Sequence, residues 1–201
     1  MAKPVIWKKG AKGQLTVEQK QLIAAFEDML IKAAADAGRR LGALTVESAG
    51  RFGVKMEERF MSSSSKSHRF YRASVGSSIE RMVYAHLPKW VTSMDPQPSS
   101  EGWSGIYTGK IGTSTDIVPV TFAIEYTKSG GGLPCTYNRS RPDIRLVLGK
   151  GTDSASYEAL FDLTSEGQAG HILKKGDAWM KKANVAYIAE IIWMNDDIMH
   201  L

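Results

Sequence analysis

Two strand-like segments separated by a turn-rich connection constrain the fold of this chain more than any other part of its sequence. In residues 141–148 (RPDIRLVL), isoleucine and leucine occupy alternate positions, which is typical of a strand with one buried face. In residues 157–163 (YEALFDL), four apolar residues lie close to one aspartate: Ala159, Leu160, Phe161 and Leu163 around Asp162. The connection at 149–156 (GKGTDSAS) is rich in Gly, Ser and Asp, as hairpin loops are. The sequence therefore predicts an antiparallel hairpin.

This hairpin would bring two carboxylates together. Asp143 lies near the start of the first strand, and Asp162 lies near the end of the second. Two adjacent carboxylates repel each other unless a cation lies between them, and Mg²⁺ prefers hard oxygen ligands. A divalent cation site at this end of the hairpin is therefore expected.

The same residues carry a resemblance to a known superfamily. Pro142 and Asp143 match the PD element, and Asp162-Leu163-Thr164 falls where the acid-x-lysine element is expected, so the sequence resembles the PD-(D/E)xK, or restriction-endonuclease-like, nucleases. Residues 162–171 (DLTSEGQAGH) look more narrowly like a signature of nuclease toxin domains used between competing bacteria. In that signature an Asp-x-Thr and a following Gln replace the usual acid and lysine. The resemblance covers residues 75–195, and its specific part is 141–171.

The resemblance implies a metal-dependent phosphodiesterase. Asp143 and Asp162 would hold Mg²⁺ (or Mn²⁺), and Glu80, on the helix before the first core strand, would add a ligand. Thr164 stands where the superfamily has lysine. Two alternatives follow: the polar group comes from Gln168 or Lys174 on the next helix, or the site is weakened.

The resemblance also implies a biological setting. The expected substrate is DNA, with RNA as the alternative. The protein would be a hydrolase that acts as a toxin or effector in interbacterial competition, neutralised in its producer by a cognate immunity protein.

Charge favours a polyanionic partner such as nucleic acid, because the formal net charge is +5 and the pI is near 9.2. Basic side chains around the predicted site and in the aromatic-rich stretch at 68–81 are candidates for contacts with the phosphate backbone. These candidates are Arg145, Lys175, Lys181, Lys182, Arg69 and Arg72. For the stretch at 68–81, the start of an ordinary amphipathic helix is an equally good interpretation.

The order of elements predicts an α/β fold, with a three-layer core in which a central mixed β-sheet is flanked by helices, plus an N-terminal helical region. Residues 62–67 (SSSSKS) are the best candidate for a linker. We therefore predict two units: an N-terminal helical region with its linker at 1–66, and a nuclease-like domain at 67–201.

The first helix is predicted from its cap. Thr16 and Gln19 form a capping-box pattern, and apolar residues between 22 and 33 fall on one helical face. Gly38 and Gly42 mark the predicted end. The opposite face carries Glu18, Gln21, Glu27, Lys32 and Asp36.

Further breaks are predicted along the chain. Residues 1–15 are either a basic arm or a peripheral strand. A helix at 79–87 should end at Pro88, and the turn formers at 93–104 predict a loop.

In the second half, strands are predicted at 105–111, 117–126 and 186–193. Pro119 would place its strand at a sheet edge or a bulge. Glu125 is either a third carboxylate of the site or a solvent-facing residue. A helix that starts near residue 167 should be interrupted at Gly176 and Asp177.

Composition excludes several classes of protein. The single Cys135 excludes an intramolecular disulfide and a multi-cysteine zinc site. No run approaches the ~20 apolar residues of a spanning helix, and the first residues lack the apolar core of a secretory signal. We therefore expect no membrane insertion and a cytoplasmic protein in the producer. If the protein is a toxin, as the resemblance implies, a dedicated secretion system would deliver it to the target-cell cytoplasm.

Two rival functions remain open at this point. One is a non-catalytic nucleic-acid-binding module on the same fold, suggested by the missing motif lysine. The other is a structural protein of a phage or secretion apparatus, with the N-terminal helix as its assembly surface. The sequence does not indicate an oligomeric state.

Overall fold

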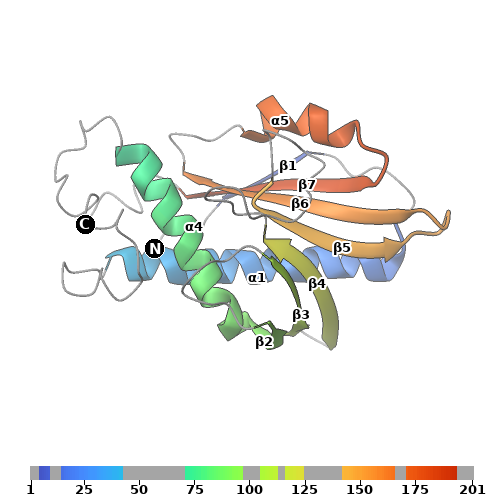
Figure 1. Cartoon of the computed structure of the whole chain (residues 1–201), viewed down its shortest axis with the longest axis horizontal. Helices are drawn as coiled ribbons and strands as arrows, with labels where there is room; N and C mark the ends of the chain where they lie inside the picture. The colour runs from blue at the N-terminus through green and yellow to red at the C-terminus, as the bar shows by residue number, and fades with distance from the viewer. Residues whose placement is uncertain are drawn as a thin grey trace.

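In the computed structural model, one open β-sheet forms the centre of the molecule (Figure 1). The structure describes residues 5–9, 15–42, 71–96, 105–112, 116–124, 142–165 and 171–193. The seven strands have the order β1-β7-β6-β5-β4-β3-β2. Their bounds are β1 Val5–Lys9, β2 Val91–Asp95, β3 Gly105–Gly112, β4 Ile117–Ile124, β5 Ile144–Lys150, β6 Ser156–Ser165 and β7 Val185–Trp193. The described helices are α1 Val17–Gly42, α4 Tyr71–Trp90 and α5 His171–Met180.

The sheet is mixed, as predicted. Neighbouring strands pair antiparallel except β6 and β7, which are parallel and are connected through α5. The predicted hairpin is confirmed: β5 and β6 pair antiparallel, with Ile144 opposite Phe161 and Leu146 opposite Ala159. The register shifts between Val147 and Gly149. Gly149 has a φ of 76°, a conformation that glycine adopts without the steric cost of a Cβ.

Helices cover both faces of the sheet. On one face, Phe26 of α1 lies between two strand residues, with its ring centroid 5.4 Å from that of Phe122 and 5.2 Å from that of Phe161. Leu87 of α4 joins the same buried cluster. On the other face, Trp179 of α5 packs with apolar residues of β6 and β7 in a smaller cluster. Figure 1 shows α5 and α1 on opposite sides of β6 and β7.

The predicted capping box starts α1. The Thr16 N–H donates to Gln19 Oε1 at 3.0 Å, and the Gln19 N–H donates to Thr16 Oγ1 at 3.2 Å. The amide of Gln19 has a second role, because its Nε2 donates to the carbonyls of Leu148 (2.8 Å) and Gly149 (3.2 Å) at the end of β5. The N-terminal cap of α1 is therefore tied to the hairpin. At its other end, α1 extends to Gly42, one of the two glycines predicted to mark its end.

Glu27 and Asp36 lie on the polar face of α1, yet both are only 6% exposed. The Tyr187 hydroxyl donates to Glu27. Asp36 Oδ2 accepts hydrogen bonds from Lys89 Nζ at 2.7 Å and Trp90 Nε1 at 3.0 Å. The apolar stripe of α1 does not reveal that α4 and β7 also cover part of its polar side. The buried carboxylates are tolerated because hydrogen-bond donors reach them.

Two predicted breaks in helices are wrong. α4 continues through Pro88, which is exposed, and ends two residues later at Trp90. α5 continues through Gly176 and Asp177 to Met180, and Gly176 is buried within it. In both helices, the packing of the helix against the sheet outweighs the tendency of proline or glycine to end a helix.

Part of the predicted loop at 93–104 is strand. Residues 91–95 form β2, which pairs with β3 at the edge of the sheet. Val91 and Met94 are buried but lie three positions apart, and Ser93 between them has a φ of 53°. The register shift within this strand hides it from the two-residue alternation rule.

Pro119 lies in β4, between β3 and β5 in the strand order. The ladder with β5 covers only the end of β4, at Phe122–Ile124, so the side of Pro119 turned away from β3 carries no ladder bond. This local edge explains how proline is accommodated.

At the outer edge, β1 pairs with β7, which confirms the peripheral-strand alternative for the N-terminal residues.

The serine-rich stretch at 62–67 and the boundary at 66/67 lie outside the described residues, as do Glu125 and Cys135. The division into two units stays a prediction, although α1 shares one buried cluster with α4 and the strands. None of the helices in the described ranges combines the length and apolar character needed to cross a membrane.

The contact between Gln19 and the β5 carbonyls predicts a stability effect. Gln19→Ala should lower the free energy of unfolding by about 1–3 kcal/mol, because the Leu148 carbonyl loses a buried donor. Gln21→Ala, on the exposed side of the same helix, is the matched control and should change stability by less than about 0.5 kcal/mol. Urea denaturation of both variants measures the difference, and equal midpoints would contradict the proposed anchoring.

Tyr187 predicts a loss of stability at alkaline pH. Burial and its hydrogen bond to Glu27 raise the pKa of Tyr187 above the ordinary value of about 10. Above that pH the unfolded chain loses a proton that the folded chain keeps, so stability falls as pH rises, by up to about 1.4 kcal/mol per pH unit.

In Tyr187→Phe this part of the slope should vanish. Denaturation at pH 8 would measure the lost hydrogen bond, and denaturation between pH 10 and 11 would measure the titration. An unchanged alkaline slope in the variant would show that Tyr187 ionises normally in the fold.

Candidate active site

The hairpin holds Asp143 against β6. Its backbone N–H donates to the Phe161 carbonyl at 3.1 Å, and its Oδ2 accepts the Leu163 N–H at 2.6 Å. These two partners flank Asp162 in sequence, so Asp143 and Asp162 are neighbours across the end of the hairpin. The short contact with Leu163 has the length of a charge-assisted hydrogen bond, and it orients the Asp143 carboxylate.

Asp162 is almost fully buried, with 2% of its surface exposed. Phe161 and Leu163 belong to the cluster under α1 and α4, so strand alternation puts Asp162 on the other face, with Leu160 and the α5 cluster. Thr164, two residues further along β6, is also buried on that face, at 3%. This arrangement puts the acid and the threonine of the motif side by side.

β7 adds a carboxylate that the sequence analysis did not select. Glu190 is in register with Asp162 across the parallel β6–β7 ladder, so the two side chains project from the same face. Glu190 is fully buried. The signal in the sequence was an isolated acid within the otherwise apolar run at 186–193.

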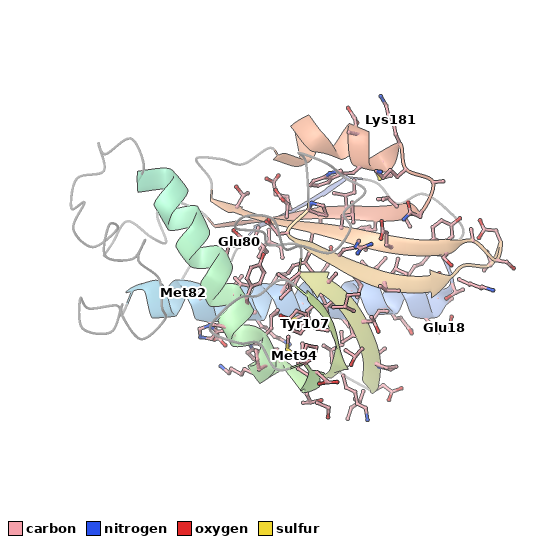
Figure 2. The ribbon with its side chains drawn as sticks, in the orientation of Figure 1. Glu18, Glu80, Met82, Met94, Tyr107 and Lys181 are labelled. Carbon is pink, nitrogen blue, oxygen red and sulfur yellow. The ribbon has the colours of Figure 1, made fainter. Side chains whose placement is uncertain are left out.

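Tyr84 of α4 is the second residue that the sequence analysis missed. It is fully buried, and its hydroxyl donates to Glu80 Oε1 at 2.8 Å. Burial raises the pKa of Tyr84 well above its ordinary value, and the negative charges of Glu80, Asp143 and Asp162 raise it further. The negative charges of the three carboxylates predicted from the sequence therefore act on one phenol, and only Glu80 contacts it among the hydrogen bonds described above. Figure 2 shows Glu80 on α4 beside the strands.

The oxygen donors present fit the chemistry of Mg²⁺ or Mn²⁺, which bind carboxylates and retain several water ligands. In the part of the chain that the structure describes, no three His, Cys, Asp or Glu side chains are close enough together to hold a metal ion directly. The geometry therefore favours Asp143 and Asp162 as the direct pair. Glu80 is instead held by Tyr84.

Arg145 lies on the same face as Asp162, because it pairs with Leu160 across the hairpin. Its Nη1 is 3.4 Å from Glu158 Oε2, and Glu158 also accepts a hydrogen bond of 2.9 Å from Asn184 Nδ2. The Arg145 side chain is 26% exposed. Arg145 is thus anchored by Glu158 and still reaches solvent.

The predicted lysine contacts lie further away. Lys181 and Lys182 follow α5 and lead into β7, whose first residue, Val185, pairs with Glu158. Glu158 precedes Asp162 by four residues, roughly 13 Å along a strand. Figure 2 shows Lys181 beyond α5, well separated from Glu80. These lysines therefore stand at the opposite end of β6 from the carboxylates.

Other predicted site residues are placed only in part. Lys174 and Lys175 belong to α5, and Arg72 belongs to α4, but their side chains lie outside the described residues. Gln168 and Arg69 lie outside the described residues altogether. The choice between Gln168 and Lys174 as the replacement for the motif lysine stays open.

Comparison with known proteins adds no relative. No family model matches this chain, and neither a curated protein nor a solved structure matches it. The functional argument therefore depends on the residues and the geometry described above.

The hydrogen bond from Leu163 predicts a stability difference between two Asp143 variants. Asp143→Ala should lower the free energy of unfolding by about 1.5–3 kcal/mol, because the Leu163 N–H loses a charged acceptor. Asp143→Asn retains a neutral acceptor and should lose less. Denaturation in the presence of EDTA measures both without bound cations. If the alanine variant were as stable as the natural protein, the hydrogen bond would not be holding the hairpin end together.

Proposed function

We propose that the protein is a metal-dependent phosphodiesterase that hydrolyses nucleic acid. One observation carries the proposal: Asp143 and Asp162 are neighbours at the end of the β5–β6 hairpin, and together with Glu80 they act on the same buried tyrosine. Paired carboxylates near a third acid are suited to a divalent cation and to phosphoryl chemistry.

In the proposed mechanism, Asp143 and Asp162 would hold Mg²⁺, and the backbone carbonyl of Leu163 would add an oxygen. When bound, the cation would polarise the scissile phosphate and lower the pKa of a bound water. Thr164 lies two residues beyond Asp162 on the same face, where it can orient the substrate or the attacking water. Gln168 or Lys174 would assist from the region after β6.

Arg145 is the best-placed contact for the substrate backbone. It projects from the face that carries Asp162, and Glu158 limits its freedom. A guanidinium held in this way binds phosphate with a smaller loss of side-chain entropy than a free one. The proposed substrate is DNA, with RNA as the second choice, and the net charge of +5 supports a polyanion of either kind.

The fold supports a narrower proposal. A mixed sheet with helices on both faces, a hairpin carrying the two acids and a preceding helix carrying Glu80 agree with the three-layer restriction-endonuclease-like arrangement. With the resemblance of residues 141–171, this agreement supports a DNase toxin of interbacterial competition. Neutralisation by an immunity protein and delivery by a secretion system belong to this proposal.

A second candidate is a non-catalytic nucleic-acid-binding module on the same fold. Two observations favour it: Thr164 occupies the position of the motif lysine, and the described side chains do not assemble three direct metal ligands. Such a module would bind nucleic acid and leave it intact.

Plasmid cleavage tests the proposal. Purified protein with Mg²⁺ should degrade plasmid DNA, and EDTA should abolish the reaction. Asp162→Asn should reduce the rate by at least about 100-fold, because the carboxylate that would bind the cation loses its charge. Gel electrophoresis over a time course gives the rates.

Asp153→Asn is the matched control. It removes an exposed aspartate from the turn at the other end of the same hairpin and should leave cleavage unchanged. Intact plasmid and intact RNA in every reaction, with nucleic-acid binding retained in Asp162→Asn, would favour the binding module instead.

A further inference from the structure

The carboxylate of Glu158 is divided between two partners. Its Oε1 accepts a hydrogen bond of 2.9 Å from Asn184 Nδ2, and its Oε2 lies 3.4 Å from Arg145 Nη1. The backbone N–H of Glu158 also donates to the Asn184 carbonyl at 2.8 Å. Asn184 lies in the turn between α5 and β7. It therefore contacts Glu158 twice, and these contacts direct the second carboxylate oxygen toward Arg145.

The two charges of this ion pair are buried to different degrees. The side chain of Glu158 is 9% exposed, whereas that of Arg145 is 26% exposed. Their contact runs through one guanidinium nitrogen, and at 3.4 Å it is longer than the roughly 2.7–2.9 Å of a strong charge-assisted hydrogen bond. Glu158 therefore restricts the guanidinium from the inside and leaves part of it at the surface.

Arg145 lies at a defined distance from the candidate site. It pairs with Leu160, which precedes Asp162 by two residues, or about 7 Å along the strand. A stacked nucleic-acid strand advances about 3.4 Å per nucleotide. A phosphate about two nucleotides away from one bound at Asp162 would therefore lie level with Arg145.

We propose that Glu158 and Asn184 are positioning residues, which together hold the Arg145 guanidinium in place for a phosphate about two nucleotides from the scissile bond. This inference rests on the proposed function, because its ligand is nucleic acid. Restricting Arg145 before binding reduces the side-chain entropy that is lost when the phosphate binds. Asn184 and Glu158 act through Arg145 and need not touch the substrate.

A positioning role and a purely structural role of Glu158 predict changes of opposite sign. An acid beside the substrate repels phosphate, so removing its charge should strengthen nucleic-acid binding when Glu158 only stabilises the fold. If Glu158 positions Arg145, Glu158→Gln should weaken binding instead. This variant keeps the size of the side chain and an oxygen that can accept from Asn184.

Fluorescence anisotropy of a short labelled DNA duplex tests the proposal, in EDTA and at about 0.15 M salt, where the repulsion by one acid is largely screened. Glu158→Gln and Asn184→Ala should each weaken binding about two- to tenfold, which is the cost of ordering one long side chain. Arg145→Ala should weaken binding and lower the slope of log K against log salt by about 1. In the Arg145→Ala background, Glu158→Gln should no longer weaken binding.

Asp28→Asn is the matched control. Asp28 also pairs with a cation, Lys32, but both side chains are exposed on α1, on the other side of the sheet. Removing this charge should not weaken DNA binding. If Glu158→Gln did not fold, Asn184→Ala would decide, because Asn184 is exposed and its replacement leaves both charges of the ion pair in place.

The outcomes separate this inference from the proposed function. Binding by Glu158→Gln as tight as that of the natural protein, or an equal loss without Arg145, would overturn the positioning role and leave the nuclease proposal standing. Weakened binding that depends on Arg145, in a protein that cleaves neither DNA nor RNA, would support the positioning role and favour the binding module. Failure of the natural protein to bind DNA or RNA, with EDTA or with Mg²⁺, would overturn both proposals.

Discussion

The register of the β5–β6 hairpin is the constraint on which both the core and the candidate site depend. Side chains alternate along β6, so Phe161 packs against Phe26 on one face while Asp162 projects from the other. A slip by one residue would bury the acid in the aromatic core and move the phenylalanine to the opposite face of the sheet. The carboxylate pair is therefore fixed by the same pairing that builds the hydrophobic layer under α1. Gln19 adds to this, because it ties the start of α1 to the end of β5.

Buried carboxylates in this fold are of two kinds. Glu27 and Asp36 accept hydrogen bonds from residues of other elements, and these contacts bind α1 to β7 and α4. These hydrogen bonds offset the cost of burying the two carboxylates, and they leave neither carboxylate available to a ligand. The second kind, Asp162 and Glu190, lies on the other face of the sheet, where the two side chains project side by side from adjacent strands.

The sequence predicted the local features and missed those that depend on packing between distant segments. The capping box of Thr16 and the hairpin were predictable, because their signals lie within a few residues. β2 was missed because Ser93 and the register shift disrupt its alternation. The burial of Glu27 was not predicted, because the pattern of a single helix does not reveal what packs on its polar side. Tyr84 was missed because the acids Asp143 and Asp162, whose charges act on it, are remote in sequence.

The position of Glu80 depends on how the helices pack. α4 is held to α1 by Lys89 and Trp90, which reach Asp36, and α1 is held to β6 through Phe26. The position of Glu80 relative to the hairpin is thus set in part by residues at the C-terminal end of α4. An element from the N-terminal third of the chain therefore helps to define a site whose acids lie mostly in the second half. For this reason α1 is better understood as part of the scaffold of the candidate site than as a separate appendage.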